Sequence, residues 1–192
     1  MVEEIELTGN CFWIELKEAC YGWQYISLHF GSTEIPFYAS YMGLEPLTTL
    51  IDSVLELETD DDDYYEIRWS DEPGRLIITL EKFDSKLKIH IVETDADPFD
   101  SADGTIEKEW RFVMDYSAYR EAIINYGLQQ LKRYGLRGYN ANWSDGWDRF
   151  PMNGLLILLG TKSRWIMDDD SYYSNIFEEL KLLEQQLRDI EI

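Results

Sequence analysis

The sequence predicts an α+β fold, in which an antiparallel sheet of about six to eight strands is covered by three main helices. Two periodicities support this prediction. Seven segments are rich in β-branched and aromatic residues and are separated by glycine, proline or aspartate, as strands and their turns require. Three further segments repeat apolar residues every three or four positions, which is the period of an amphipathic helix.

The first three strand segments form an antiparallel meander punctuated by Gly22 and Gly31. They cover residues 11–16, 23–30 and 34–39. Pro36 has no N–H to give to a neighbouring strand, so its strand is expected at a sheet edge or broken there.

A helix is predicted over residues 47–55, with Pro46 near its first turn. It runs directly into the acidic run Asp60, Asp61, Asp62 and Asp63. Negative charge at a helix C-terminus opposes the helix dipole, so this placement indicates a task other than folding.

Four more strands are expected after the acidic run, covering residues 64–69, 75–82, 87–93 and 106–114. Leu76, Ile78 and Leu80 alternate with more polar positions, which predicts one face more buried than the other.

A second helix is expected over residues 116–134, with Asp115 as its N-cap and Gly135 as its stop. Residues 136–150 read as a loop, and residues 151–159 fit either a short helix or a buried strand. The last helix, about residues 171–190, repeats apolar residues at spacings of three and four and is expected to pack on the body. With no linker or repeat, residues 1–192 are expected to form a single domain.

The charge balance predicts a positively charged partner. The chain holds 38 Asp and Glu against 17 Lys and Arg, a net charge of −21. Besides the Asp60 to Asp63 run, acidic residues gather in a segment over residues 93–107, which contains Asp95, Asp97, Asp100 and Asp103. Such runs are also typical of plain solvated surface.

Other classes of protein are disfavoured. The N-terminus has no secretion signal and the apolar runs are too short to span a bilayer, so a cytoplasmic protein without a membrane partner is expected. Cys11 and Cys20 are expected to be reduced thiols. His29 and His90 lack any metal-ligand spacing, and no calcium-loop, nucleophile-elbow or nucleotide-binding motif is present. The sequence therefore predicts no catalytic residue, no metal and no cofactor.

The segment around Trp143, Asp145, Trp147 and Asp148 combines indole rings with carboxylates and amides. This composition suits a protein interface or sugar stacking, and it also suits a loop pinned by buried tryptophans. Carboxylates beside tryptophan also occur in glycoside hydrolases, but no carboxylate pair can be chosen from sequence.

Residues 69–78, and residues 131–139 continuing to Trp143 and Pro151, resemble segments of bacterial immunity proteins that protect against polymorphic or contact-dependent toxins. The resemblance covers about a third of the chain. It implies a small cytoplasmic inhibitor that blocks a toxin domain without catalysis.

These observations converge on an acidic protein that binds a basic toxin domain, such as a nuclease, and does not bind nucleic acid directly. It is expected to be a monomer or a weak homodimer. The predicted partner-binding residues are Asp60, Asp61, Asp62, Asp63, Asp95, Asp97, Asp100, Asp103, Trp143, Asp145, Trp147 and Asp148. Two alternatives stay open: a glycan-acting enzyme or carbohydrate-binding module that uses residues 143–150, and a DNA-mimic inhibitor of a DNA-binding protein.

Overall fold

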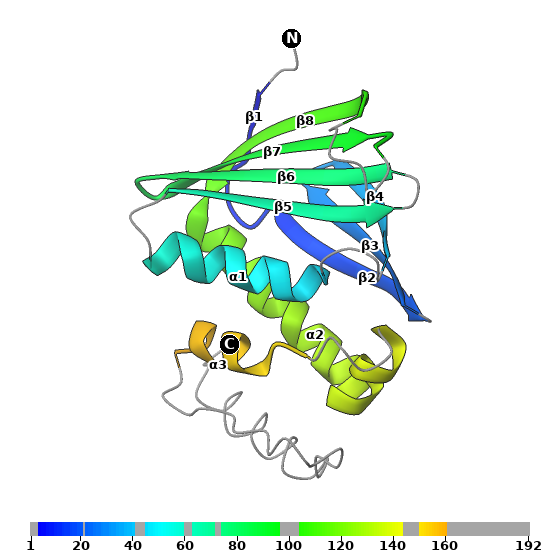
Figure 1. The fold of residues 1–192 in the computed structure, drawn as a ribbon. Helices are drawn as coiled ribbons and strands as arrows, with labels where there is room; N and C mark the ends of the chain where they lie inside the picture. Colours follow the sequence, from blue (N-terminus) through cyan, green and yellow to red (C-terminus); the bar gives the residue numbers. More distant parts are fainter. Residues whose placement is uncertain are drawn as a thin grey trace.

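The computed structural model describes residues 4–20, 22–40, 45–59, 63–71, 74–96, 104–143 and 150–160. The described chain forms two β-sheets, of five and three strands, with helices packed beneath them (Figure 1). The α+β class and the expected number of strands are confirmed. The division into two sheets was not predicted, because a period of two identifies a strand but not its neighbours.

The three-stranded sheet contains β2 (Phe12–Cys20), β3 (Trp23–Phe30) and β4 (Thr33–Ser40), in that order and antiparallel. This is the predicted meander. Pro36 lies in the edge strand β4, as its missing N–H requires. Strand β2 has a bulge between Leu16 and Glu18, which places Lys17 opposite no residue of β3.

The five-stranded sheet has the order β1-β8-β7-β6-β5. Its strands are β1 (Glu4–Glu6), β8 (Ile106–Asp115), β7 (Lys86–Thr94), β6 (Gly74–Phe83) and β5 (Tyr64–Asp71). Strands β5 to β8 form an antiparallel meander, whereas β1 pairs parallel to β8. The sequence did not indicate β1, because its three exposed residues show no alternation of burial. Leu76, Ile78 and Leu80 are buried, which confirms the predicted inner face.

Three helices lie on the described part of the chain: α1 (Pro46–Thr59), α2 (Tyr116–Trp143) and α3 (Met152–Leu158). Helix α1 packs against β5, and α2 packs against β2. Of the two alternatives for residues 151–159, the helix is observed. A Cβ atom on Gly154 would lie 2.5 Å from Ile51 Cγ2, so α3 reaches α1 only because this residue is glycine.

The predicted end of the second helix is only partly right. Gly135 leaves the helical conformation at φ 62° and ψ 176°, but the chain resumes a helix that ends at Trp143. The loop expected over residues 136–150 is therefore wrong for residues 136–143. Leu136 and Tyr139 are buried there, so tertiary packing extends the helix beyond the glycine. The expected N-cap Asp115 is the last residue of β8, and its carboxylate pairs with Lys86 Nζ at 3.0 Å.

The two sheets and the first helix share one hydrophobic core. Phe30 of β3 stacks on Phe112 of β8, with ring centroids 4.1 Å apart. The rings of Phe37 in β4 and Trp69 in β5 have centroids 5.9 Å apart. The Trp69 indole N–H donates to Thr49 Oγ1 of α1 at 2.9 Å. The last predicted helix, about residues 171–190, lies outside the described residues, so the single domain over residues 1–192 stays a prediction.

A buried polar group joins α1, α2 and β3, and we call it the Glu45 cluster: Glu45, Gln24, Tyr126, Gln130 and Tyr139. Glu45 is 5% exposed, and its carboxylate accepts hydrogen bonds from the backbone N–H groups of the residues at positions 47 (3.0 Å) and 48 (2.5 Å). It also accepts from Gln24 Nε2 at 3.3 Å and from the Tyr139 hydroxyl. Tyr126 and Gln130 donate to Gln24 Oε1 at 3.1 and 3.3 Å. Burial raises the pKa of Glu45, while the Tyr139 hydroxyl opposes that rise.

Helix α2 also covers the free edge of β2. The Arg133 guanidinium donates to the carbonyl oxygens of Leu16 at 2.9 Å and Lys17 at 3.1 Å, next to the bulge. These two carbonyls are therefore occupied, and a further strand cannot pair with them.

Candidate binding site

The described residues of the two acidic segments, Asp63 and Asp95, lie at opposite ends of the five-stranded sheet. Asp63 is exposed just before β5, and its carbonyl oxygen accepts from the Lys82 N–H at 2.7 Å. Asp95 is exposed just after β7, and it lines a pocket together with Asp71, the last residue of β5. The ends of β7 and β5 lie at the same side of the sheet (Figure 1). The eight residues of β5 separate these ends by about 26 Å at ~3.3 Å per residue. Asp63 and Asp95 are therefore too far apart to contact the same side chain of a partner.

The other predicted partner-binding residues are not placed by the structure. Trp143 ends helix α2, but its side chain lies outside what the structure describes. Wholly outside the described residues are Asp60, Asp61, Asp62, Asp97, Asp100, Asp103, Asp145, Trp147 and Asp148. Their role in binding a partner stays a prediction.

At the Asp95 end, the strand ends enclose a cavity of about 190 Å³. We call it the acidic pocket, because four of its lining residues are carboxylates: Asp71, Glu93, Asp95 and Glu107. Phe37, Gly74, Arg75 and Thr94 complete the lining. Of these carboxylates, Asp95 was predicted from the sequence as a partner-binding residue and Asp71 was not. The hairpin between β5 and β6 was the available signal, since it pairs Asp71 with Gly74 at the sheet end.

The acidic pocket carries unequal carboxylates. Burial, together with the nearby Glu93 charge, raises the pKa of Asp71 to about 6. Glu93 accepts two hydrogen bonds from Lys108 Nζ, both at 3.0 Å, and Asp95 Oδ1 accepts from the Thr105 N–H at 2.5 Å. Asp71 is therefore the carboxylate whose ionised form a positive group from outside would stabilise most.

Replacing Asp71 by Asn is expected to raise the melting temperature at pH 7.5 and to leave it unchanged near pH 4. The native-state pKa of about 6 lies above the ordinary value of 3.8, so the native state binds the extra proton between these values and loses that stabilisation as the pH rises through 6. Because Asp71 is half-buried, solvent screening limits the gain to about 1 kcal/mol. Thermal unfolding at both pH values measures the effect. Asp84→Asn in the exposed turn after β6 is the control, and an equal gain for Asp71→Asn at pH 4 would contradict the assignment.

The outer face of the five-stranded sheet interleaves acids and bases. Arg68 pairs with Glu66 at 2.7 Å, and Arg111 and His90 both contact Glu109, at 2.8 and 2.9 Å. Pairs of this kind are screened by solvent and add little to stability. They also balance the charge locally. The electrostatic attraction of a charged partner is therefore weaker at this face than at the two ends of the sheet.

Within the described ranges, no group of three His, Cys, Asp or Glu residues is arranged to hold a metal ion. His29 lies 3.2 Å from Glu15, and His90 lies 2.9 Å from Glu109, so each imidazole has a carboxylate neighbour. Cys11 is a free thiol that donates to the Thr8 carbonyl oxygen at 2.8 Å. Among the described helices, none is both long and apolar enough to cross a membrane.

No protein-family model matches the chain, and no curated protein matches it. Among solved structures, it is similar to a chain of a "CdiA-CT/CdiI toxin and immunity complex from Enterobacter cloacae". The similarity has a TM-score of 0.41 and 12% sequence identity, and it covers 59% of this chain and 97% of that chain. A likeness at this level carries no argument about what the present protein binds.

Proposed function

We propose that the protein is a non-catalytic, acidic immunity protein that binds and blocks a basic toxin domain such as a nuclease. The observation that carries the proposal is the excess of carboxylates, a net charge of −21, together with the acidic pocket that holds Asp71. The resemblance of residues 69–78 and 131–151 to immunity proteins points to a toxin domain as the basic partner.

The electrostatics suit an inhibitor of a nuclease. A domain that cuts nucleic acid carries lysines and arginines to hold phosphates, and an acidic protein can occupy those side chains. Opposed fields also steer the encounter, and they can raise the association rate by 10-fold or more at low salt. Carboxylates at both ends of the five-stranded sheet would contribute to such a field.

Two cavities lined by described residues are small enough to suit a side chain of a protein partner. The acidic pocket has about 190 Å³, and a second cavity between β2 and α2 has about 230 Å³. Both are below the range of about 300–1,000 Å³ that is typical of small-molecule and cofactor sites. A cavity of this size suits a single side chain of a partner.

Co-expression with the toxin domain encoded next to the gene is expected to restore growth, and the two proteins should co-purify in a 1:1 complex. Growth rescue without a complex would indicate an enzyme that reverses damage. Absence of rescue together with glycan binding would favour the carbohydrate-binding alternative. Binding to a host DNA-binding protein in place of a toxin would favour the DNA mimic.

Neutralising the acidic segments should slow association with the toxin domain. Asn at Asp60 to Asp63, or at Asp71 and Asp95, is expected to lower the association rate about 10-fold at low salt and to weaken its salt dependence. The matched control replaces Glu66 and Glu81 by Gln, which removes two exposed carboxylates from the charge-balanced outer face. Stopped-flow kinetics measure the rates, and an equal loss in the control would mean that total charge, not its position, decides the rate.

A further inference from the structure

The outer face of the three-stranded sheet presents aromatic rings to solvent. Trp13 of β2 is 46% exposed and Tyr38 of β4 is 50% exposed, although both belong to well-paired strands. The inner face of the same strands is buried in the core. Exposed Trp and Tyr on a regular surface are typical of the central residues of protein interfaces.

These rings are held in place before any partner binds. Trp13 stacks on its cross-strand neighbour His29, with centroids 4.5 Å apart and planes 5° apart. Tyr25 stacks on Tyr38 in the same way, at 4.2 Å and 4°. Rings that are already ordered lose little conformational entropy on binding. We call Trp13, His29, Tyr25 and Tyr38 the aromatic face.

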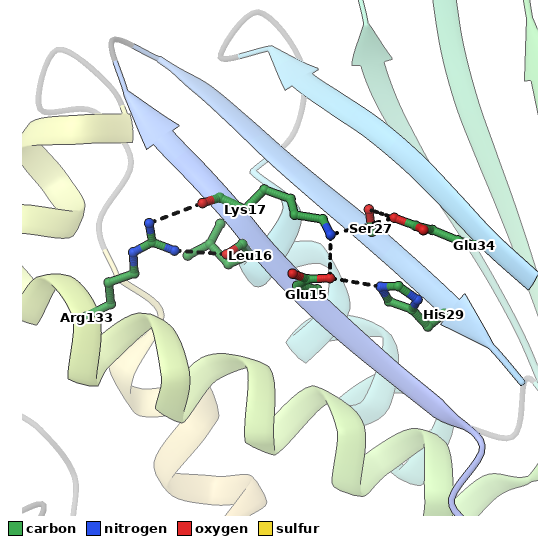
Figure 2. A network of polar contacts seen from close by, with 7 residues as sticks. All are labelled: Glu15, Leu16, Lys17, Ser27, His29, Glu34 and Arg133. Carbon is green, nitrogen blue, oxygen red and sulfur yellow. Dashed lines mark hydrogen bonds and ion pairs between the residues drawn. The ribbon is translucent and has the colours of Figure 1, made fainter. Parts of the chain in front are cut away.

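A charged network lies on the same face (Figure 2). Lys17 Nζ is 2.6 Å from Glu15 Oε2 and 3.7 Å from Glu34 Oε1. Ser27 Oγ donates to Glu34 at 2.8 Å, and His29 Nε2 lies 3.2 Å from Glu15. The Lys17 ammonium lowers the pKa of Glu15, which keeps that carboxylate ionised. The side chains of Glu15 and Glu34 are still 45% and 49% exposed, so solvent reaches both of them.

The face therefore combines aromatic rings with an excess of negative charge. Glu15, Glu18 and Glu34 stand against one ammonium, that of Lys17. Arginine suits this combination better than lysine, because its planar guanidinium stacks on aromatic rings and also pairs with carboxylates through two parallel hydrogen bonds. The edge route is closed at Leu16 and Lys17, where Arg133 holds both carbonyl oxygens (Figure 2). At these two positions a partner strand cannot pair with β2, which leaves the face available to side chains of a partner.

We infer that the aromatic face is the surface that receives arginine side chains of the basic partner. The inference rests on the proposed function, since it assumes a basic protein partner. It adds the surface on which that partner docks and the type of basic residue that the partner presents. The acidic pocket acts through charge and accepts lysine and arginine alike, whereas the aromatic face discriminates between them.

Two peptides of equal charge, nona-arginine and nona-lysine, test the inference at 0.15 M salt, where weak long-range attraction is screened. The arginine peptide is expected to bind about five-fold more tightly to the wild type. Trp13→Ala and Tyr38→Ala should each reduce this preference to less than about two-fold. Tyr64→Ala is the matched control, because Tyr64 is 52% exposed on the five-stranded sheet, and it should keep the full preference.

Chemical shifts give a readout that does not depend on the alanine variants folding. The indole N–H resonance of Trp13, assigned with Trp13→Phe, should shift with the arginine peptide and stay in place with the lysine peptide. Equal affinity for the two peptides, an unmoved Trp13 resonance, or a preference that survives both alanine variants would overturn the inference. Binding of cellohexaose or chitohexaose that is lost in Trp13→Ala would overturn it in favour of a glycan. If any of these results accompanies growth rescue by the wild type, only the docking surface is wrong and the immunity function stands.

Discussion

Replacing Glu45 by alanine is expected to lower the free energy of unfolding by about 3 kcal/mol or more. The substitution removes the carboxylate that caps the N-terminus of α1, and the loss of such a cap alone costs about 1 kcal/mol. It also leaves the Gln24 amide and the Tyr139 hydroxyl, both buried, without the acceptor that they now share. Each buried donor without a partner costs about 1–3 kcal/mol.

Urea denaturation measures this loss of stability. One further variant separates the contribution of the Tyr139 hydrogen bond from that of the helix cap, and another serves as a control. Tyr139→Phe removes one donor and keeps the cap, so a smaller loss of about 1 kcal/mol is expected. Glu121→Ala is the control, because it removes an exposed glutamate from helix α2. A loss below about 1 kcal/mol for Glu45→Ala would contradict this prediction. It would show that the cost of desolvating the carboxylate offsets the stabilisation from its four hydrogen bonds.

Replacing Trp69 by alanine is expected to lower the free energy of unfolding by about 3–5 kcal/mol. Trp69 is fully buried, and it touches Phe37 of the other sheet and Thr49 of α1. The substitution therefore opens a cavity where both sheets and the first helix meet. Trp69→Phe keeps most of the volume and should lose about half as much or less.

Hydrogen exchange of β3 and β6 amides in Trp69→Ala checks the proposal of a single cooperative domain. Both strands should lose protection by the same factor, because the damaged contact belongs to both sheets. Loss of protection confined to one sheet would indicate two independently unfolding units and would contradict the proposal of one domain.

The sequence predicted local structure well where one periodicity decides it. Strand β3 has the predicted bounds, and α1 and β5 to β8 differ from the prediction by a few residues at their ends. These segments are long and strongly patterned, so the local preferences of their residues favour the same secondary structure. Which strands share a sheet depends on contacts such as that between Phe30 and Phe112, and no local pattern records these contacts.

The candidate site was predicted less well than the fold. Net charge predicts a positively charged partner, but it did not indicate that Asp71 would join Asp95 in one pocket. The residues of the aromatic face stand in the sequence at positions 13, 25, 29 and 38 of the first three strand segments. The face was missed because alternation predicts two faces for each strand but does not say which face is buried. That depends on where the second sheet packs.

Strand β1 gives the five-stranded sheet a short and acidic border. Three residues long, it exposes Glu4 and Glu6 on either side of Ile5, at the outermost position next to β8. A second copy that tried to continue the sheet there would bring like charges together over very few backbone hydrogen bonds. This border therefore disfavours the growth of fibres by edge-to-edge pairing. The proposed function would require this property, since an immunity protein must be present before its toxin arrives.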